Sequence, residues 1–130
     1  MAELRTVLVI DDDPDFVRAT KKVLESVPYR VVTAANGTEG VKMARAEKPD
    51  VILLDVIMPL KDGFSTCEAL KAEPALEDVP VIMLTSFAQK VAETSLSVSQ
   101  GMSLEADDYI DKPVAPVELL RRVARLMKKQ

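Results

Sequence analysis

Short apolar runs alternate with longer amphipathic stretches along this chain, and the alternation restricts its fold more than any other feature. Runs rich in Val, Ile and Leu occupy Val7 to Ile10, Val31 to Thr33, Val51 to Leu54 and Val81 to Leu84, and a weaker run follows at Asp108 to Asp111. Continuous apolar runs of this length are typical of strands that are buried on both faces. The pattern therefore predicts five strands in one parallel sheet.

The stretches that separate these runs have the spacing of helices. Apolar side chains recur at helical intervals, namely Phe16, Ala19, Val23 and Val27 in the first stretch, Val41 and Ala44 in the second, Phe64, Cys67 and Leu70 in the third, and Val117, Leu120, Val123 and Met127 in the last. Alternating strands and helices predict a doubly wound α/β fold with helices on both faces of the sheet. Such sheets bind ligands beyond the carboxyl ends of their strands.

Composition excludes several classes of function. The 130 residues include 17 basic and 21 acidic side chains, with no basic block longer than a pair, so direct nucleic-acid binding has no electrostatic basis. There is no histidine and Cys67 is the only cysteine, which leaves neither a zinc cluster nor a disulfide framework. No apolar run approaches the roughly 18 residues of a membrane span. We expect one domain over residues 1–130, located in the cytoplasm and not bound to a membrane.

Acids, a hydroxyl and an amine follow the predicted strands, where a ligand site is expected. They are Asp11, Asp12 and Asp13 after the first strand, Asp55 after the third, Thr85 after the fourth and Lys112 after the fifth. Carboxylates that are forced together repel unless a cation lies between them, and magnesium prefers such oxygen ligands. One carboxylate can then attack a phosphoryl group, while Lys112 supplies positive charge and Thr85 bonds a phosphoryl oxygen.

Some of these residues also have ordinary structural interpretations. Asp13 precedes Pro14 and is expected only to cap the first helix, outside the site. Thr85 could cap the helix that follows it, and Lys112 could be an exposed lysine. Asp55 ends an apolar strand, so its carboxylate requires a partner there, which favours a functional role.

Four motifs in this order resemble the receiver domains of response regulators in bacterial two-component systems. They are VLVIDDDP, VILLDVIMPLKDG, VIMLTS and DDYIDKP, and together they cover nearly the whole chain. The resemblance implies a flavodoxin-like (βα)5 fold with strand order 2-1-3-4-5. It also implies a signalling phosphoacceptor rather than an ordinary enzyme, one that catalyses its own phosphorylation and slow dephosphorylation.

The resemblance assigns the chemistry to particular residues. It makes Asp55 the phosphoacceptor and Asp11 and Asp12 the acidic pair that serves Mg2+, with Asp12 the direct carboxylate ligand. The backbone carbonyl of Ile57 would be a further metal ligand. Lys112 would hold the transferred phosphoryl group.

The resemblance also assigns a conformational switch. Thr85 matches the switch hydroxyl, and Tyr109 matches the aromatic side chain whose rotamer follows phosphorylation. An ordinary aromatic residue of an edge strand is the alternative for Tyr109. Pro113 would follow a cis peptide bond.

Two departures from the family pattern concern the lifetime of the phosphoryl group and the surface that a downstream partner would recognise. Ile57 and Phe87 are apolar where other receivers often carry polar groups that orient water, so we expect slow loss of the phosphoryl group. The segment from Ser86 to Asp108 is about five residues longer than usual, and loops tolerate such insertions. It places Glu105 where the family usually has glycine, on the expected output surface.

The implied partners are a sensor histidine kinase or histidine phosphotransfer protein as donor, and a downstream output protein or an output domain absent from this chain. A homodimer that forms on phosphorylation is also compatible with the family. A haloacid-dehalogenase-like phosphatase would need a D-x-D-x-[TV] motif, which fails here at Asp15. A flavodoxin-like FMN carrier would need a glycine- and hydroxyl-rich phosphate loop, whereas three aspartates would repel the phosphate. A pseudo-receiver is disfavoured by the complete set of site residues.

Overall fold

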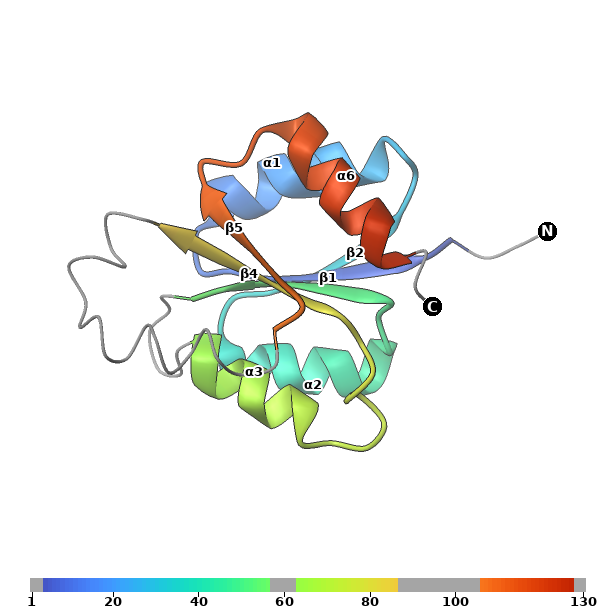
Figure 1. Ribbon diagram of the computed structural model, residues 1–130, viewed down its shortest axis with the longest axis vertical. Helices are drawn as coiled ribbons and strands as arrows, with labels where there is room; N and C mark the ends of the chain where they lie inside the picture. The colour runs from blue at the N-terminus through green and yellow to red at the C-terminus, as the bar shows by residue number, and fades with distance from the viewer. Residues whose placement is uncertain (1–3, 57–62, 87–105, 128–130) are drawn as a thin grey trace.

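A central sheet between two layers of helices makes up the computed structural model, which describes residues 4–56, 63–86 and 106–127 (Figure 1). The strands are β1 (Thr6–Ile10), β2 (Arg30–Ala34), β3 (Val51–Asp55), β4 (Val81–Ser86) and β5 (Asp108–Lys112). The helices are α1 (Pro14–Glu25), α2 (Gly37–Glu47), α3 (Gly63–Lys71) and α6 (Pro116–Met127). Helices α1 and α6 cover one face of the sheet, and α2 and α3 cover the other.

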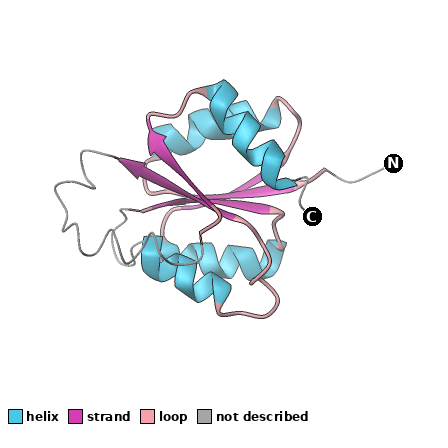
Figure 2. Cartoon of the chain, viewed as in Figure 1, coloured by secondary structure: helices cyan, strands magenta, loops and turns pink. Residues whose placement is uncertain are grey.

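The strand order is β2-β1-β3-β4-β5, and every neighbouring pair is parallel. This confirms the predicted α/β fold and its strand order. The chain first moves outward from β1 to β2 and then crosses to β3 on the other side (Figure 2). The carboxyl ends of β1 and β3 therefore lie side by side at the point where the winding reverses, which is where such sheets bind ligands.

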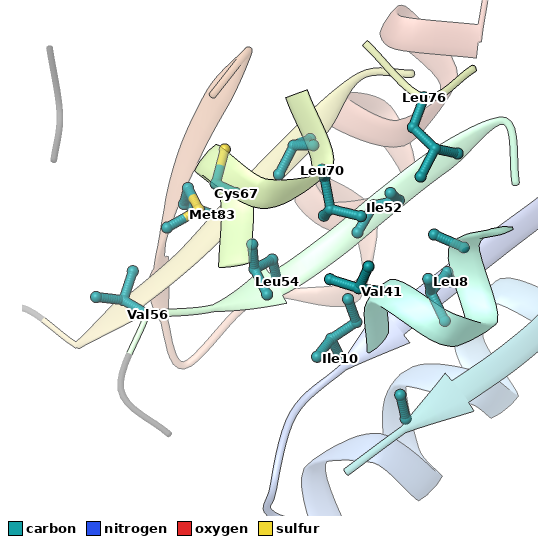
Figure 3. Close-up of a cluster of buried hydrophobic side chains, with 13 residues drawn as sticks. Leu8, Ile10, Val41, Ile52, Leu54, Val56, Cys67, Leu70, Leu76 and Met83 are labelled. Carbon is teal, nitrogen blue, oxygen red and sulfur yellow. The ribbon is translucent and has the colours of Figure 1, made fainter. Parts of the chain in front are cut away.

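Both faces of the sheet are buried under apolar side chains, as its uninterrupted apolar strands predict. The cluster beneath α2 and α3 includes Leu8, Ile10, Val41, Ile52, Leu54, Val56, Cys67, Leu70, Leu76 and Met83 (Figure 3). The cluster beneath α1 and α6 includes Val7, Val9, Leu24, Leu53, Ile82, Leu84, Ile110, Leu119 and Val123. Cys67 is buried in the first of these clusters, as expected. These two clusters form a closely packed base for the residues at the strand ends.

Asp13 starts α1 as predicted. Its side chain accepts hydrogen bonds from the backbone N–H groups of Asp15 and Phe16, and Pro14 is the first helical residue. These bonds satisfy N–H groups that have no partner within the helix. Asp13 is therefore accounted for by the helix that it caps.

The predicted apolar face of α1 is wrong at two positions. Val27 lies beyond the end of the helix, because Pro28 disfavours helical backbone at the residue before it. The Val27 side chain is 47% exposed. Ala19 is exposed, and the buried positions of the helix are Thr20 and Leu24. Alanine carries too little apolar surface to determine which face of a helix is buried.

The predicted face of α6 is wrong at Val117, which is 79% exposed. The buried stripe instead runs through Leu119, Val123 and Leu126. These three residues have the i, i+4, i+7 spacing of one helical face, and Val117 falls on the opposite side. Val123 and Met127 were assigned to the buried face correctly.

Candidate functional site

Three acidic side chains gather at the carboxyl edge of the sheet. Ile10 of β1 pairs with Leu54 of β3, so Asp11 and Asp55 come next on two adjacent strands. Carboxylate oxygens from Asp11, Asp12 and Asp55 all lie within 4.8 Å of one another. Asp11 and Asp55 are buried, whereas Asp12 is exposed. The cluster therefore has a buried base and one carboxylate open to solvent.

Lys112 brings a positive charge to this cluster from the end of β5. Its Nζ lies 2.8 Å from Oδ2 of Asp11 and 3.5 Å from Oδ1 of Asp55. It also lies 4.3 Å from the centre of the Phe16 ring, a cation–π contact. Burial by itself would lower the pKa of Lys112, but the hydrogen bond to Asp11 and the charge of Asp55 outweigh it and raise the pKa. Lys112 therefore remains protonated at neutral pH.

Asp11 is held through both carboxylate oxygens. Its Oδ2 accepts the hydrogen bond from Lys112, and its Oδ1 accepts one of 2.9 Å from the backbone N–H of Asp13. Its own N–H donates to the carbonyl of Ala34 at the end of β2. The bonds from Asp13 and Lys112 orient the side chain of Asp11, and the bond to Ala34 fixes its backbone.

The start of α3 approaches the backbone of Asp55 very closely, and only glycine fits there. A Cβ atom on Gly63 would lie 2.3 Å from the carbonyl oxygen of Asp55 and 2.6 Å from Cα of Val56. The N–H of Gly63 donates to the carbonyl of Val56 at 2.8 Å. The glycine of the K-D-G motif therefore allows α3 to pack against the end of β3.

Thr85 lies on β4, and Tyr109 lies on β5. Thr85 is 3% exposed, and its Oγ1 donates a hydrogen bond of 2.7 Å to Oδ1 of Asp111. Tyr109 is half-buried against the cluster beneath α2 and α3, and burial raises the pKa of its hydroxyl, with a smaller contribution from Cys67. The peptide bond between Lys112 and Pro113 is cis, as predicted.

The structure thus brings together the side chains of Asp11, Asp12, Asp55 and Lys112. Ile57 and Phe87 lie outside the described residues, as does the segment of residues 87–105. Two contacts were missed from the sequence, those made by Phe16 and by Asp111. Asp111 had a usable signal, since it is an acid immediately before Lys112 at a strand end, whereas Phe16 matched the pattern of an ordinary core residue.

The donor set fits a small divalent cation. The ligand atoms are carboxylate oxygens, which Mg2+ prefers, and they come from Asp11, Asp12 and Asp55. One ammonium group on Lys112 faces three carboxylates, so the cluster keeps a negative charge that a bound cation would offset. Within the described residues, these three aspartates form the group whose carboxylate oxygens are spaced closely enough to share a metal ion.

Comparison with known proteins gives one family. The model of the response regulator receiver domain matches residues 7–124. The probable transcriptional regulator ycf27 of Cyanophora paradoxa is 36% identical over 125 residues, which make up 96% of this chain and 49% of that protein. This chain therefore spans about half the length of the curated relatives that it matches.

Solved structures show the same similarity. The signal receiver domain of a signal transduction histidine kinase from Syntrophus aciditrophicus superposes with a TM-score of 0.86 at 34% identity, covering 96% of this chain and 91% of that one. The receiver domain of the sensor histidine kinase PA1611 from Pseudomonas aeruginosa PAO1 superposes with a TM-score of 0.83 at 30% identity. The superposition covers 97% of this chain and 99% of that one. That structure has a magnesium ion coordinated in its active site cleft. Among the helices described for the present chain, none is long and apolar enough to cross a membrane.

Proposed function

Because this chain belongs to the response regulator receiver domain family, it acts as a phosphoacceptor in two-component signal transduction, and we propose that Asp55 accepts the phosphoryl group. The carrying observation is the position of its carboxylate, at the end of β3, 3.5 Å from Lys112 and within the acidic cluster. Asp11 accepts hydrogen bonds from Lys112 and from the backbone N–H of Asp13, which suits a residue that positions Lys112 and serves the metal. Asp12 is exposed and has the position of a metal ligand.

Receiver domains bind Mg2+, and we assign the ion to Asp11, Asp12 and Asp55, with Asp12 as the direct ligand. The carbonyl of Ile57 is the further ligand in this proposal and lies outside the described residues. When bound, Mg2+ supplies positive charge that offsets both the carboxylates and the incoming phosphoryl oxygens. Lys112 provides fixed positive charge to the same oxygens.

In the proposed transfer, a carboxylate oxygen of Asp55 attacks the phosphorus atom of a phosphohistidine on a sensor histidine kinase or phosphotransfer protein. The phosphorus–nitrogen bond breaks, and its electron pair leaves with the histidine. The product is an acyl phosphate on Asp55. Lys112 then faces a dianion, and the Thr85 hydroxyl can donate to one of its oxygens.

The switch would convert this local charge into a change of surface. Thr85 moving toward the phosphoryl group and Tyr109 changing rotamer would alter the side of the domain formed by β4 and β5. A downstream output protein, or an output domain outside this chain, would recognise the change. Full-length relatives that are named transcriptional regulators favour an output through another domain. We place the protein in the cytoplasm, and include a phosphorylation-dependent homodimer among the states to test.

We also propose that the receiver loses its phosphoryl group slowly. Ile57 and Phe87 provide no polar side chain to orient an attacking water. Replacing Ile57 with Asn should therefore shorten the lifetime of the phosphorylated protein at a fixed Mg2+ concentration. A lifetime in the parent no longer than in Ile57→Asn would contradict this proposal.

The test of the acceptor is the intact mass of the protein after incubation with acetyl phosphate. We expect the parent to gain one phosphoryl group when Mg2+ is present and none when the ion is chelated. Asp55→Asn should gain none. Asp78→Asn makes the same chemical change at an exposed position outside the site and should behave like the parent.

Two results would count against the proposal. An adduct that persists in Asp55→Asn would place the acceptor on another residue. An adduct that forms equally well without a divalent cation would remove the role assigned to the acidic cluster.

A further inference from the structure

A buried hydroxyl on β4 is bound to an acid on the neighbouring strand. Thr85 and Asp111 are directly paired in the register of β4 and β5, and Oγ1 of Thr85 donates to Oδ1 of Asp111 at 2.7 Å. Thr85 is 3% exposed, whereas Asp111 is exposed. Hydrogen bonds to an ionised acceptor are stronger than those between neutral groups. The contact therefore holds the Thr85 hydroxyl in one orientation.

Adjacent residues of β5 contact different partners. Lys112 reaches toward Asp55, while Asp111 binds Thr85. Successive side chains of a strand point to opposite faces, so Asp111 shares a face with Tyr109. The partners of Asp111 and Tyr109 in the β4 register are Thr85 and Met83. Asp111 is therefore on the face that carries both proposed switch residues.

We propose that Asp111 is a positioning residue that holds the Thr85 hydroxyl away from Asp55 until Asp55 is phosphorylated. This rests on the proposed function of Asp55 and of Thr85. A hydroxyl has one proton to donate, so Thr85 cannot donate to Asp111 and to a phosphoryl oxygen at the same time. The phosphoryl group must compete with the Asp111 carboxylate for that proton.

The consequence is a bias toward the unphosphorylated arrangement. A contact made in only one of two conformations stabilises that conformation. Removing the acceptor should increase the fraction of molecules in which Thr85 is free to turn toward Asp55. Asp111 would thereby set how readily this receiver is switched, without itself touching the reacting atoms.

The experiment measures the initial rate of adduct formation with acetyl phosphate and Mg2+ by intact mass. We expect Asp111→Ala to gain the phosphoryl group roughly ten- to a hundredfold faster than the parent, the effect of losing one hydrogen bond to a charged group. Asp111→Asn keeps an acceptor oxygen but not the charge, so it should lie between the two. Should Asp111→Ala prove unfolded by circular dichroism, Asp111→Asn carries the test.

Two controls separate the hydrogen bond from other effects. Asp15→Asn removes a negative charge from an exposed side chain in the first turn of α1, near the same edge of the sheet, and should leave the rate within about twofold of the parent. Thr85→Val removes the donor. In that background Asp111→Ala should no longer raise the rate, because the contact that it removes is already absent.

The outcomes distinguish the two proposals. A parent that forms an adduct on Asp55 at the same rate as Asp111→Ala and Asp111→Asn would overturn the role of Asp111 and leave the acceptor assignment intact. A rate increase that persists in the Thr85→Val background would also overturn it, because Asp111 would then act by charge alone. A parent that forms no adduct on Asp55 would overturn the proposed function and this inference together.

Discussion

Substitution of Gly63 by alanine should damage both the stability of the fold and the proposed phosphoacceptor site. The added Cβ would lie 2.3 Å from the carbonyl oxygen of Asp55, where ordinary contacts begin at 3.4 Å. Relief requires a shift of about 1 Å, and no side chain can yield because the neighbouring atoms belong to the backbone. The N–H of Val56 is bonded to Leu84 of β4, so the shift would strain the sheet. Overpacking costs about 1–3 kcal/mol, and we expect the upper end here.

Gly40→Ala is the matched control. Its Cβ would meet the side chain of Ile10, with Cδ1 at 2.5 Å and Cγ1 at 2.9 Å, so a buried side chain rather than the backbone has to shift. Alanine also gains about 1 kcal/mol over glycine inside a helix, which offsets the cost of moving Ile10. Urea denaturation followed by circular dichroism should therefore show a loss of about 3 kcal/mol for Gly63→Ala and about 1 kcal/mol or less for Gly40→Ala.

The same two variants should differ in phosphorylation by acetyl phosphate. Gly63→Ala displaces the backbone that carries Asp55, so we expect its initial rate to fall by roughly tenfold or more, since small misplacements of reacting groups are costly. Gly40→Ala should stay near the parent. A Gly63→Ala protein as stable as Gly40→Ala would refute the argument from backbone contact.

Two further predictions concern charge. Lys112→Met leaves the buried carboxylates of Asp11 and Asp55 without their ammonium partner, so without divalent cations it should lose about 3 kcal/mol, and Mg2+ should recover more stability in the variant than in the parent. An equal effect of Mg2+ on the urea midpoints of both proteins would contradict this. Hydrogen bonds from Arg121 and Arg122 lower the pKa of Glu118, so its stabilising contribution is present above its ordinary value of 4.5 and is lost as pH falls through the lower folded value. Glu118→Gln should therefore weaken the pH dependence of the urea midpoint below about pH 4.5; identical acid profiles would rule this out.

The strands could be predicted closely because a strand buried on both faces has to be apolar at every position. The run Val7 to Ile10, for example, lies within β1, and the run Val51 to Leu54 lies within β3. The acidic cluster follows from the same information, since parallel strands that are adjacent in a sheet end at the same edge. Strand order itself came from the family resemblance, because apolar runs do not specify which strands are neighbours.

Contacts that depend on register or on side-chain direction could not be predicted. The bond between Thr85 and Asp111 exists because β4 and β5 pair with these two residues opposite each other. No property of either residue indicates that alignment. Likewise, the exposure of Val117 depends on how α6 is rotated against the sheet, and a short apolar pattern does not determine that rotation.

The ion pair between Lys112 and Asp11 joins residues that are 101 positions apart in the chain. Because β1 lies inside the sheet, between β2 and β3, the site is complete only after strands distant in sequence have found their places. Contacts of such high sequence separation slow folding, because a long loop must close before they form. Under the proposed function, a newly made chain lacks the charge of Lys112 beside Asp55 until β5 docks, so the rate at which phosphorylation competence appears after refolding should report closure of the whole sheet.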